Sequence, residues 1–155
     1  YIRLTGSSNS PIVNSKDYIF EIGKSIELVK GEDVTIFATG TMVYEALQAA
    51  KFLNENNIYP NVVNVHTIKQ LDPNDIIKYI NKSKIIVTME EHNIIGGLGS
   101  AIAEINSTTA NSAQQLFIGM PDVYDNGGEY KDIKEKYGLS ANLVAKQIFN
   151  SIEKS

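Results

Sequence analysis

Three titratable side chains stand next to one another after an apolar run near the middle of the chain. Glu90, Glu91 and His92 directly follow residues 85–89, Ile-Ile-Val-Thr-Met. Histidine titrates near neutral pH, and the pKa of a partly buried carboxylate shifts readily. These groups could therefore perform acid–base chemistry or bind a cation. His66, the other histidine, follows a second apolar run in the same way, but the spacing matches no metal-binding pattern and we expect no metal site.

A glycine-rich segment follows these residues and leads into an expected helix. Gly96, Gly97 and Gly99 give the backbone access to positive φ, which we expect at Gly97 or Gly99, and allow close approach to the free N–H groups of the helix start. The dinucleotide fingerprint is absent, because Ile102 occupies its third glycine position. Two interpretations stay open: tight packing of strand against helix without a ligand, and contact with a ligand such as an anion.

One of the two carboxylates is expected to face inward. The strand before them should be buried on both faces, so the side chains at its end cannot all reach solvent. The nearest donors by sequence are the N–H groups of residues 96–100, and hydrogen bonds from them would lower the pKa of a carboxylate and fix the turn. The sequence predicts a structural role for Glu90 or Glu91 and a place for His92 at an interdomain or dimer surface.

A second candidate anion site lies at Gly40 and Thr41, between another apolar run and a helical pattern. The simpler interpretation, which we favour, is that the Thr41 side chain caps the helix.

Short apolar runs alternate with amphipathic stretches from residue 25 onward, which predicts an α/β layered fold. Residues 26–29 alternate with charge and are a candidate edge strand, with an antiparallel direction left open. The near-continuous runs predict parallel strands buried on both faces, at residues 34–38, 62–65, 85–89 and 116–120. Helices are expected after Gly40, at Pro73 behind an Asp72 cap, near Gly97, over residues 134–137 before Gly138, and behind a Ser140 cap.

Composition excludes several classes of protein. The 155 residues include no cysteine, so disulfides, thiolate nucleophiles and cysteine-ligated zinc are impossible. Lys and Arg number 14 against 18 Asp and Glu, and a net charge of −4 provides no positive field for nucleic acid or an anionic membrane. No apolar run reaches the roughly 20 residues of a membrane span. We expect a soluble, cytoplasmic protein with neither nucleic acid nor membrane as partner.

The first 18 residues are rich in Ser, Asn and Gly, a composition typical of a linker. We divide the chain into an arm from a preceding domain, residues 1–18, and one folded domain, residues 19–155. Because the chain begins at Tyr1 with strand-like residues already under way, we expect it to be part of a longer polypeptide.

Several motifs occur in an order that resembles the C-terminal domain of the transketolase family of thiamine-diphosphate enzymes. They lie at residues 31–36, 38–42, 63–69, 71–72, 87–92, 96–100 and 137–139. The Glu-Glu-His segment is similar to the two-subunit transketolase-like branch and to deoxyxylulose-phosphate synthase rather than to classical transketolases. The substrate pair therefore stays open.

The resemblance implies a three-layer α/β/α fold whose five-stranded mixed sheet has one antiparallel edge strand. It also implies that other domains hold the cofactor, thiamine diphosphate with Mg²⁺, and that this domain supports a homodimer of the full enzyme. The sequence agrees, since the Gly-Asp-Gly turn that introduces the Mg²⁺ ligands is absent. We expect the domain alone to bind no cofactor and to be inactive.

The resemblance thus predicts part of an enzyme that transfers two-carbon ketol units between sugar phosphates. Two alternatives stay open: an independent nucleotide- or anion-binding module, and the C-terminal domain of a related oxoacid dehydrogenase or ferredoxin-linked oxidoreductase.

Overall fold

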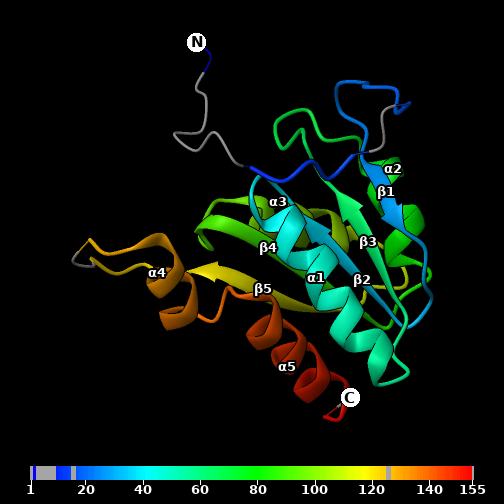
Figure 1. The fold of residues 1–155 in the computed structure, drawn as a ribbon. Helices are drawn as coiled ribbons and strands as arrows, with labels where there is room; N and C mark the ends of the chain where they lie inside the picture. Colours follow the sequence, from blue (N-terminus) through cyan, green and yellow to red (C-terminus); the bar gives the residue numbers. More distant parts are fainter. Residues whose placement is uncertain (1, 3–9, 15–16, 125–126, 155) are drawn as a thin grey trace.

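The fold is a five-stranded sheet between two layers of helices (Figure 1). The computed structural model describes residues 2, 10–14, 17–124 and 127–154. The strands are β1 (Ile26–Val29), β2 (Val34–Ala38), β3 (Pro60–Asn64), β4 (Ile85–Asn93) and β5 (Gln114–Met120), and the helices are α1 (Met42–Glu55), α2 (Pro73–Ile80), α3 (Leu98–Thr108), α4 (Tyr130–Lys136) and α5 (Ala141–Ile152).

The sheet has the strand order β1-β3-β2-β4-β5. Strands β2 to β5 are parallel to one another, while β1 pairs with β3 in the antiparallel direction. This confirms the mixed sheet with one antiparallel edge strand. Ile36 at the centre of β2 pairs with Val62 of β3 on one side and Val87 of β4 on the other.

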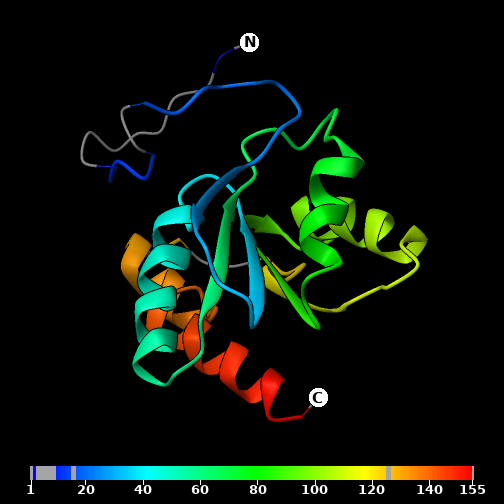
Figure 2. The ribbon, with the colours of Figure 1, turned by 90° about the vertical axis from the view of Figure 1, so that its right-hand side faces the viewer.

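Side chains alternate between the two faces of the sheet and form two apolar clusters. Ile36 and Val87 face the cluster covered by α1 and α5, whereas Phe37 and Ile86 face the cluster covered by α2 and α3. Figure 2 shows the two helical layers on opposite sides of the sheet. Every residue of β2 and β3 is buried, as the apolar runs predict.

Strand β5 departs from the expected burial. Phe117 is 39% exposed, and Ile118 is the one residue of β5 that is buried. The expectation that residues 116–120 are buried on both faces is wrong, because β5 is an edge strand that pairs with β4 alone.

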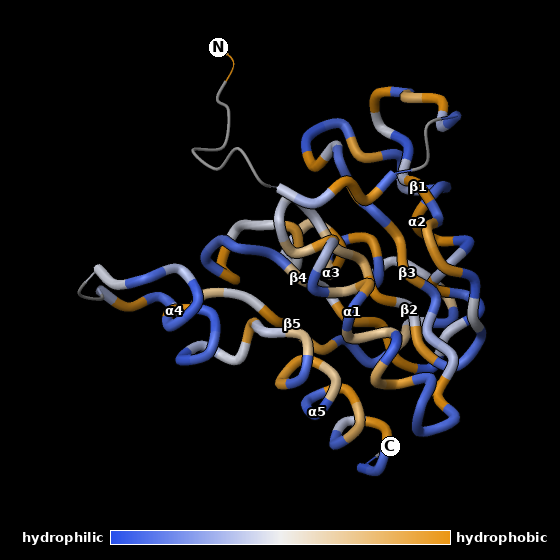
Figure 3. The backbone as a smooth tube through the Cα atoms, viewed as in Figure 1, coloured by the Kyte–Doolittle hydropathy of each residue, from blue (hydrophilic) through white to orange (hydrophobic). Residues whose placement is uncertain are grey.

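The helices begin close to the predicted positions, but not every cap is local. The Asp72 side chain accepts a hydrogen bond from the Asn74 N–H at 2.9 Å, which confirms the cap of α2. Ser140 makes no capping bond within the described part of the chain, so the predicted Ser140 cap is wrong. The Glu45 side chain on α1 instead accepts from the Ala141 N–H at 2.9 Å. Helix α4 is longer than residues 134–137 and largely hydrophilic (Figure 3).

The N-terminal segment lies along the carboxyl edge of the sheet. Val13 packs against the cluster beneath α1, and the Asn64 side chain donates a hydrogen bond to Asn14 Oδ1 at 3.1 Å. Much of the predicted arm, namely residues 1, 3–9 and 15–16, lies outside the described residues. The boundary between residues 18 and 19 therefore stays a prediction.

Candidate functional site

The carboxyl ends of β2 and β4 are neighbours in the sheet and bring the candidate residues together. Ala38, the last residue of β2, pairs with Met89. Strand β4 does not end at residue 89 as predicted: it continues to Asn93 beside β5, so residues 90–92 run past the end of β2, where residues 39–41 leave the sheet. The chain then enters α1 on one face and α3 on the other. Open α/β sheets bind their ligands beside such a point.

Glu90 fills the start of α3 with its own carboxylate. The side chain is 2% exposed; its Oε2 accepts from the Leu98 N–H at 2.7 Å and its Oε1 from the Gly99 N–H at 2.8 Å. Negative charge is stabilised there by the helix dipole and the unpaired N–H groups. This confirms that one carboxylate faces inward and binds the turn. Two of the donors that an external anion would need are already occupied.

Close approach, not positive φ, explains two of the glycines. A Cβ atom at Gly97 would overlap the Glu90 carboxylate, and one at Gly99 would lie 2.6 Å from Phe117 Cδ1. The expectation of positive φ at Gly97 or Gly99 is wrong, since Gly97 has φ −94° and the positive value, 79°, belongs to Gly96.

Glu91 is exposed and links three segments by hydrogen bonds. Its Oε2 accepts from the Thr41 hydroxyl at the start of α1 and, at 2.8 Å, from the Tyr130 hydroxyl of α4. Among the described residues Thr41 therefore does not cap α1, and the predicted cap is wrong. Burial raises the pKa of Tyr130; Glu91 raises it further, and Thr41 opposes the shift.

Gly40 and His92 lie on the surface of the same edge. Gly40 has φ 58°, and nothing in the described part of the chain lies within 4 Å of a Cβ placed there. The exposed His92 ring places Nδ1 2.8 Å from the Asn93 carbonyl oxygen. A ligand or interface role for these residues stays a prediction.

His66 belongs to a different environment. His66 follows β3, whereas His92 lies near the end of β4, and β2 separates these two strands in the sheet. Burial lowers the pKa of His66, and Asp75 opposes that shift. Sequence reasoning missed its contact with Phe20, whose ring centroid lies 4.6 Å from that of His66.

The described residues contain neither a cluster of metal-binding side chains nor a helix that could span a membrane. No group of three or more His, Cys, Asp or Glu side chains within the described ranges could hold a metal ion. The donors at the start of α3 already bind Glu90. Within the same residues, no helix has the length and apolarity to cross a membrane.

Comparison with known proteins identifies the family. The model of the transketolase C-terminal domain matches residues 23–144. The chain belongs to this family. The putative transketolase C-terminal section of Methanocaldococcus jannaschii is 42% identical over 99% of this chain and 48% of its own length. The 1-deoxy-D-xylulose-5-phosphate synthase of Dictyoglomus turgidum is 38% identical over 86% of this chain and 22% of its own length.

A solved structure supports the same family assignment. A split-gene transketolase described as an inactive β4 tetramer has a TM-score of 0.83 and 36% identity, covering 92% of this chain and 46% of that one. The match confirms the transketolase C-terminal fold and the resemblance read from the motifs. The chain spans less than half the length of each of these relatives.

Proposed function

We propose that this domain is part of a thiamine-diphosphate-dependent enzyme that transfers two-carbon ketol units between sugar phosphates. Its own role is assembly: it supports the other domains or a partner subunit and performs no chemistry. Glu90 carries the proposal, because its buried carboxylate occupies the helix start where an anionic ligand would otherwise bind. Relatives named as transketolase and synthase support the reaction class.

The cofactor, thiamine diphosphate with Mg²⁺, is assigned to the other domains of the cytoplasmic enzyme, which we propose is a homodimer. The acidic net charge of −4 supports the absence of nucleic acid and membrane partners. An independent anion-binding module is not favoured, because in α3 the chain supplies its own anion.

Enzyme assays and calorimetry test the proposal. The 155-residue chain is incubated with thiamine diphosphate, Mg²⁺, xylulose 5-phosphate and ribose 5-phosphate, and the protein translated from the complete reading frame is assayed in parallel. We expect ketol transfer from the complete protein, together with its partner subunit where the enzyme is divided between two chains, and none from the 155-residue chain. Calorimetry should detect no binding of thiamine diphosphate or sugar phosphate by the 155-residue chain.

Two outcomes would contradict the proposal. Turnover by the 155-residue chain above about 1 s⁻¹, an ordinary enzymatic rate, would show that the domain has its own active site. Tight binding of a sugar phosphate, abolished by Thr41→Val, would place a ligand site at the carboxyl edge of the sheet.

A further inference from the structure

Phe20, in the segment before β1, lies against the imidazole ring of His66 and is itself 57% exposed. The rings of Phe20 and His66 have centroids 4.6 Å apart and are tilted by 37°. His66 Nδ1 lies 2.9 Å from the Thr67 hydroxyl oxygen, so this nitrogen has a partner. Nε2 is buried and finds no partner among the described residues. One nitrogen of the ring is thus shielded from both water and protein acceptors.

This arrangement suits a neutral ring and not a charged one. With its proton on Nδ1, the ring donates to Thr67 and leaves at Nε2 only an unpaired acceptor. Protonation adds an N–H group at Nε2, and a buried charged donor without an acceptor is costly.

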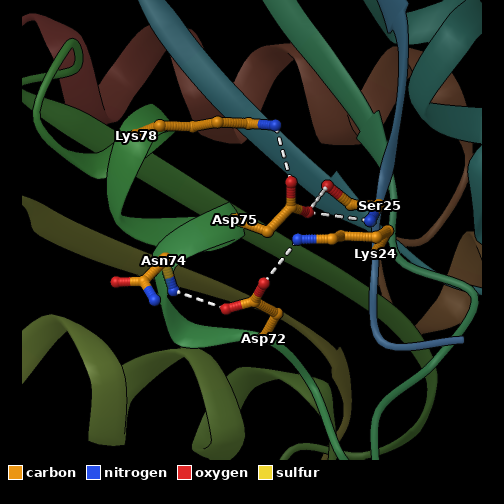
Figure 4. A network of polar contacts seen from close by, with 6 residues as sticks. All are labelled: Lys24, Ser25, Asp72, Asn74, Asp75 and Lys78. Atoms are coloured by element: carbon orange, nitrogen blue, oxygen red, sulfur yellow. Dashed lines mark hydrogen bonds and ion pairs between the residues drawn. The ribbon is translucent and has the colours of Figure 1, made fainter.

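The negative charge of Asp75 on α2 acts on His66 and favours the protonated ring. The carboxylate is already engaged: Oδ1 accepts from Lys78 at 2.6 Å, and Oδ2 accepts from the Ser25 N–H at 2.8 Å (Figure 4). Burial lowers the pKa of His66, and the opposing influence of Asp75 is smaller. Asp75 therefore does not substitute for an acceptor at Nε2.

The chain is fixed immediately after Phe20. Lys24 Nζ lies 2.6 Å from Asp72 Oδ2, and the Gly23 carbonyl accepts from the Asp72 N–H at 3.0 Å (Figure 4 shows the Lys24 contact). Gly23 has φ 89°, so a glycine with a left-handed backbone separates the fixed Lys24 from Phe20. Release of residues 17–22 would break the bond from the Lys24 N–H to the Glu21 carbonyl, 3.2 Å, and would leave the contacts of Gly23 and Lys24 with Asp72 in place.

We propose that Phe20 and His66 form a pH-sensitive latch, in which the neutral imidazole retains residues 17–22 on the sheet edge and its protonation releases them. The released state exposes the imidazole, whose pKa then approaches the ordinary value of about 6.5. The latched state binds the proton less readily. Latching is therefore complete well above pH 6.5 and weakens as the pH falls below it.

NMR titration of the 155-residue chain from pH 8 to pH 4.5 tests the latch, and the presence of just two histidines makes the assignment simple. We expect His66 to titrate below the ordinary histidine value of about 6.5, and nuclear Overhauser contacts between the Phe20 and His66 rings to disappear as His66 titrates. Phe20→Ala should raise the pKa of His66 toward about 6.5. Phe52→Ala, which removes a 43%-exposed phenylalanine of α1, should leave it unchanged.

A second pair of variants isolates the titrating group. His66→Gln should make the position of residues 17–22 independent of pH, whereas His92→Gln should leave the response intact. The latch is refuted if His66 titrates at or above the ordinary value of about 6.5 and Phe20→Ala does not alter its pKa. Persistence of the ring contacts after His66 is fully protonated, in protein that circular dichroism shows to be folded, would equally refute it.

Discussion

Glu90 illustrates how one residue can close a potential binding site. A carboxylate at the start of α3 meets the same N–H groups and helix dipole that an external phosphate would meet. Because the Glu90 carboxylate is part of the chain, it occupies this position permanently, whereas an external anion would have to bind from solution. The glycine-rich turn thus serves the packing of strand against helix.

The Glu90→Gln substitution tests this at the level of a side chain. One of the two backbone donors would face the amide NH₂ group in place of an oxygen, so we expect a loss of about 1–3 kcal/mol in the free energy of unfolding. Urea denaturation measures the loss. Glu91→Gln, at an exposed neighbour with hydroxyl partners, should cost less. Equal stability of Glu90→Gln and the unmodified protein would contradict the structural role.

Gly97→Ala should destabilise the domain by more than about 1 kcal/mol, because the added methyl group overlaps the Glu90 carboxylate. Gly127→Ala is the matched control, since a Cβ there meets nothing within 4 Å in the described residues. In the background of Glu90→Ala the cost of Gly97→Ala should fall, because the overlapping group is gone. Full additivity of the two substitutions in urea denaturation would show that the overlap is not the cause.

Between elements, Glu45 joins three helices. It lies on α1, pairs with Lys134 of α4 at 2.5 Å, and accepts from the Ala141 N–H at the start of α5. A serine at the N-cap usually accepts a hydrogen bond from a backbone N–H of the first helical turn. At the start of α5 the Glu45 side chain of another helix does this in place of Ser140.

Glu45→Ala should therefore cost more stability than Ser140→Ala, although Ser140 occupies the N-cap position of α5. We expect Glu45→Ala to lower the free energy of unfolding by about 1–3 kcal/mol, since it leaves the buried Ala141 N–H without a partner and removes the ion pair with Lys134. Ser140→Ala should change it by less than about 0.5 kcal/mol, the range of ordinary surface substitutions. Chemical denaturation of both variants measures the two losses of stability. A larger loss for Ser140→Ala than for Glu45→Ala would show that Ser140 caps α5 after all.

Asp75 connects α2 to the start of β1 and should make stability depend on acid pH. Burial raises the pKa of Asp75, but the hydrogen bonds from Lys78 and Ser25 outweigh it and hold the pKa below its usual value. The carboxylate therefore stabilises the fold above about pH 4 and ceases to do so as the pH falls through the lowered pKa. Asp75→Asn should reduce stability at pH 7 and flatten the loss between about pH 4 and pH 2.

Thermal melts across this pH range measure the effect of Asp75. Asp132→Asn, at an exposed residue of α4, is the control and should keep the acid dependence of the unmodified protein. If Asp75→Asn lost stability at low pH as much as the unmodified protein does, other carboxylates would be the cause of the acid dependence.

On the scale of the whole molecule, the two apolar clusters share their central strands. Adjacent residues Ile36 and Phe37 of β2 belong to opposite clusters, as do Ile86 and Val87 of β4. Neither cluster can lose its packing while the sheet stays intact. We expect a single cooperative unfolding transition, with coincident curves from far-UV circular dichroism and tyrosine fluorescence. Two separated transitions would show that the layers are independent.

The sequence by itself determined the features that depend on neighbouring residues. The buried runs of β2 and β4, the Asp72 cap before Pro73 and the inward carboxylate near its own turn all follow from local periodicity or short separation. In Glu90 the acceptor and its donors are 8 and 9 residues apart. Few arrangements of strand, turn and helix satisfy such close partners, so the sequence sufficed.

Tertiary structure decided the contacts between distant residues. Thr41 bonds Glu91 at a separation of 50 residues, and Ala141 bonds Glu45 at a separation of 96. The exposure of Phe117 depends on β5 lying at the edge of the sheet, and the Phe20–His66 contact depends on how the N-terminal segment crosses it. A hydroxyl or N–H group can donate to several acceptors in hydrogen bonds of similar energy. The packing of the layers decides which of these acceptors lies within reach.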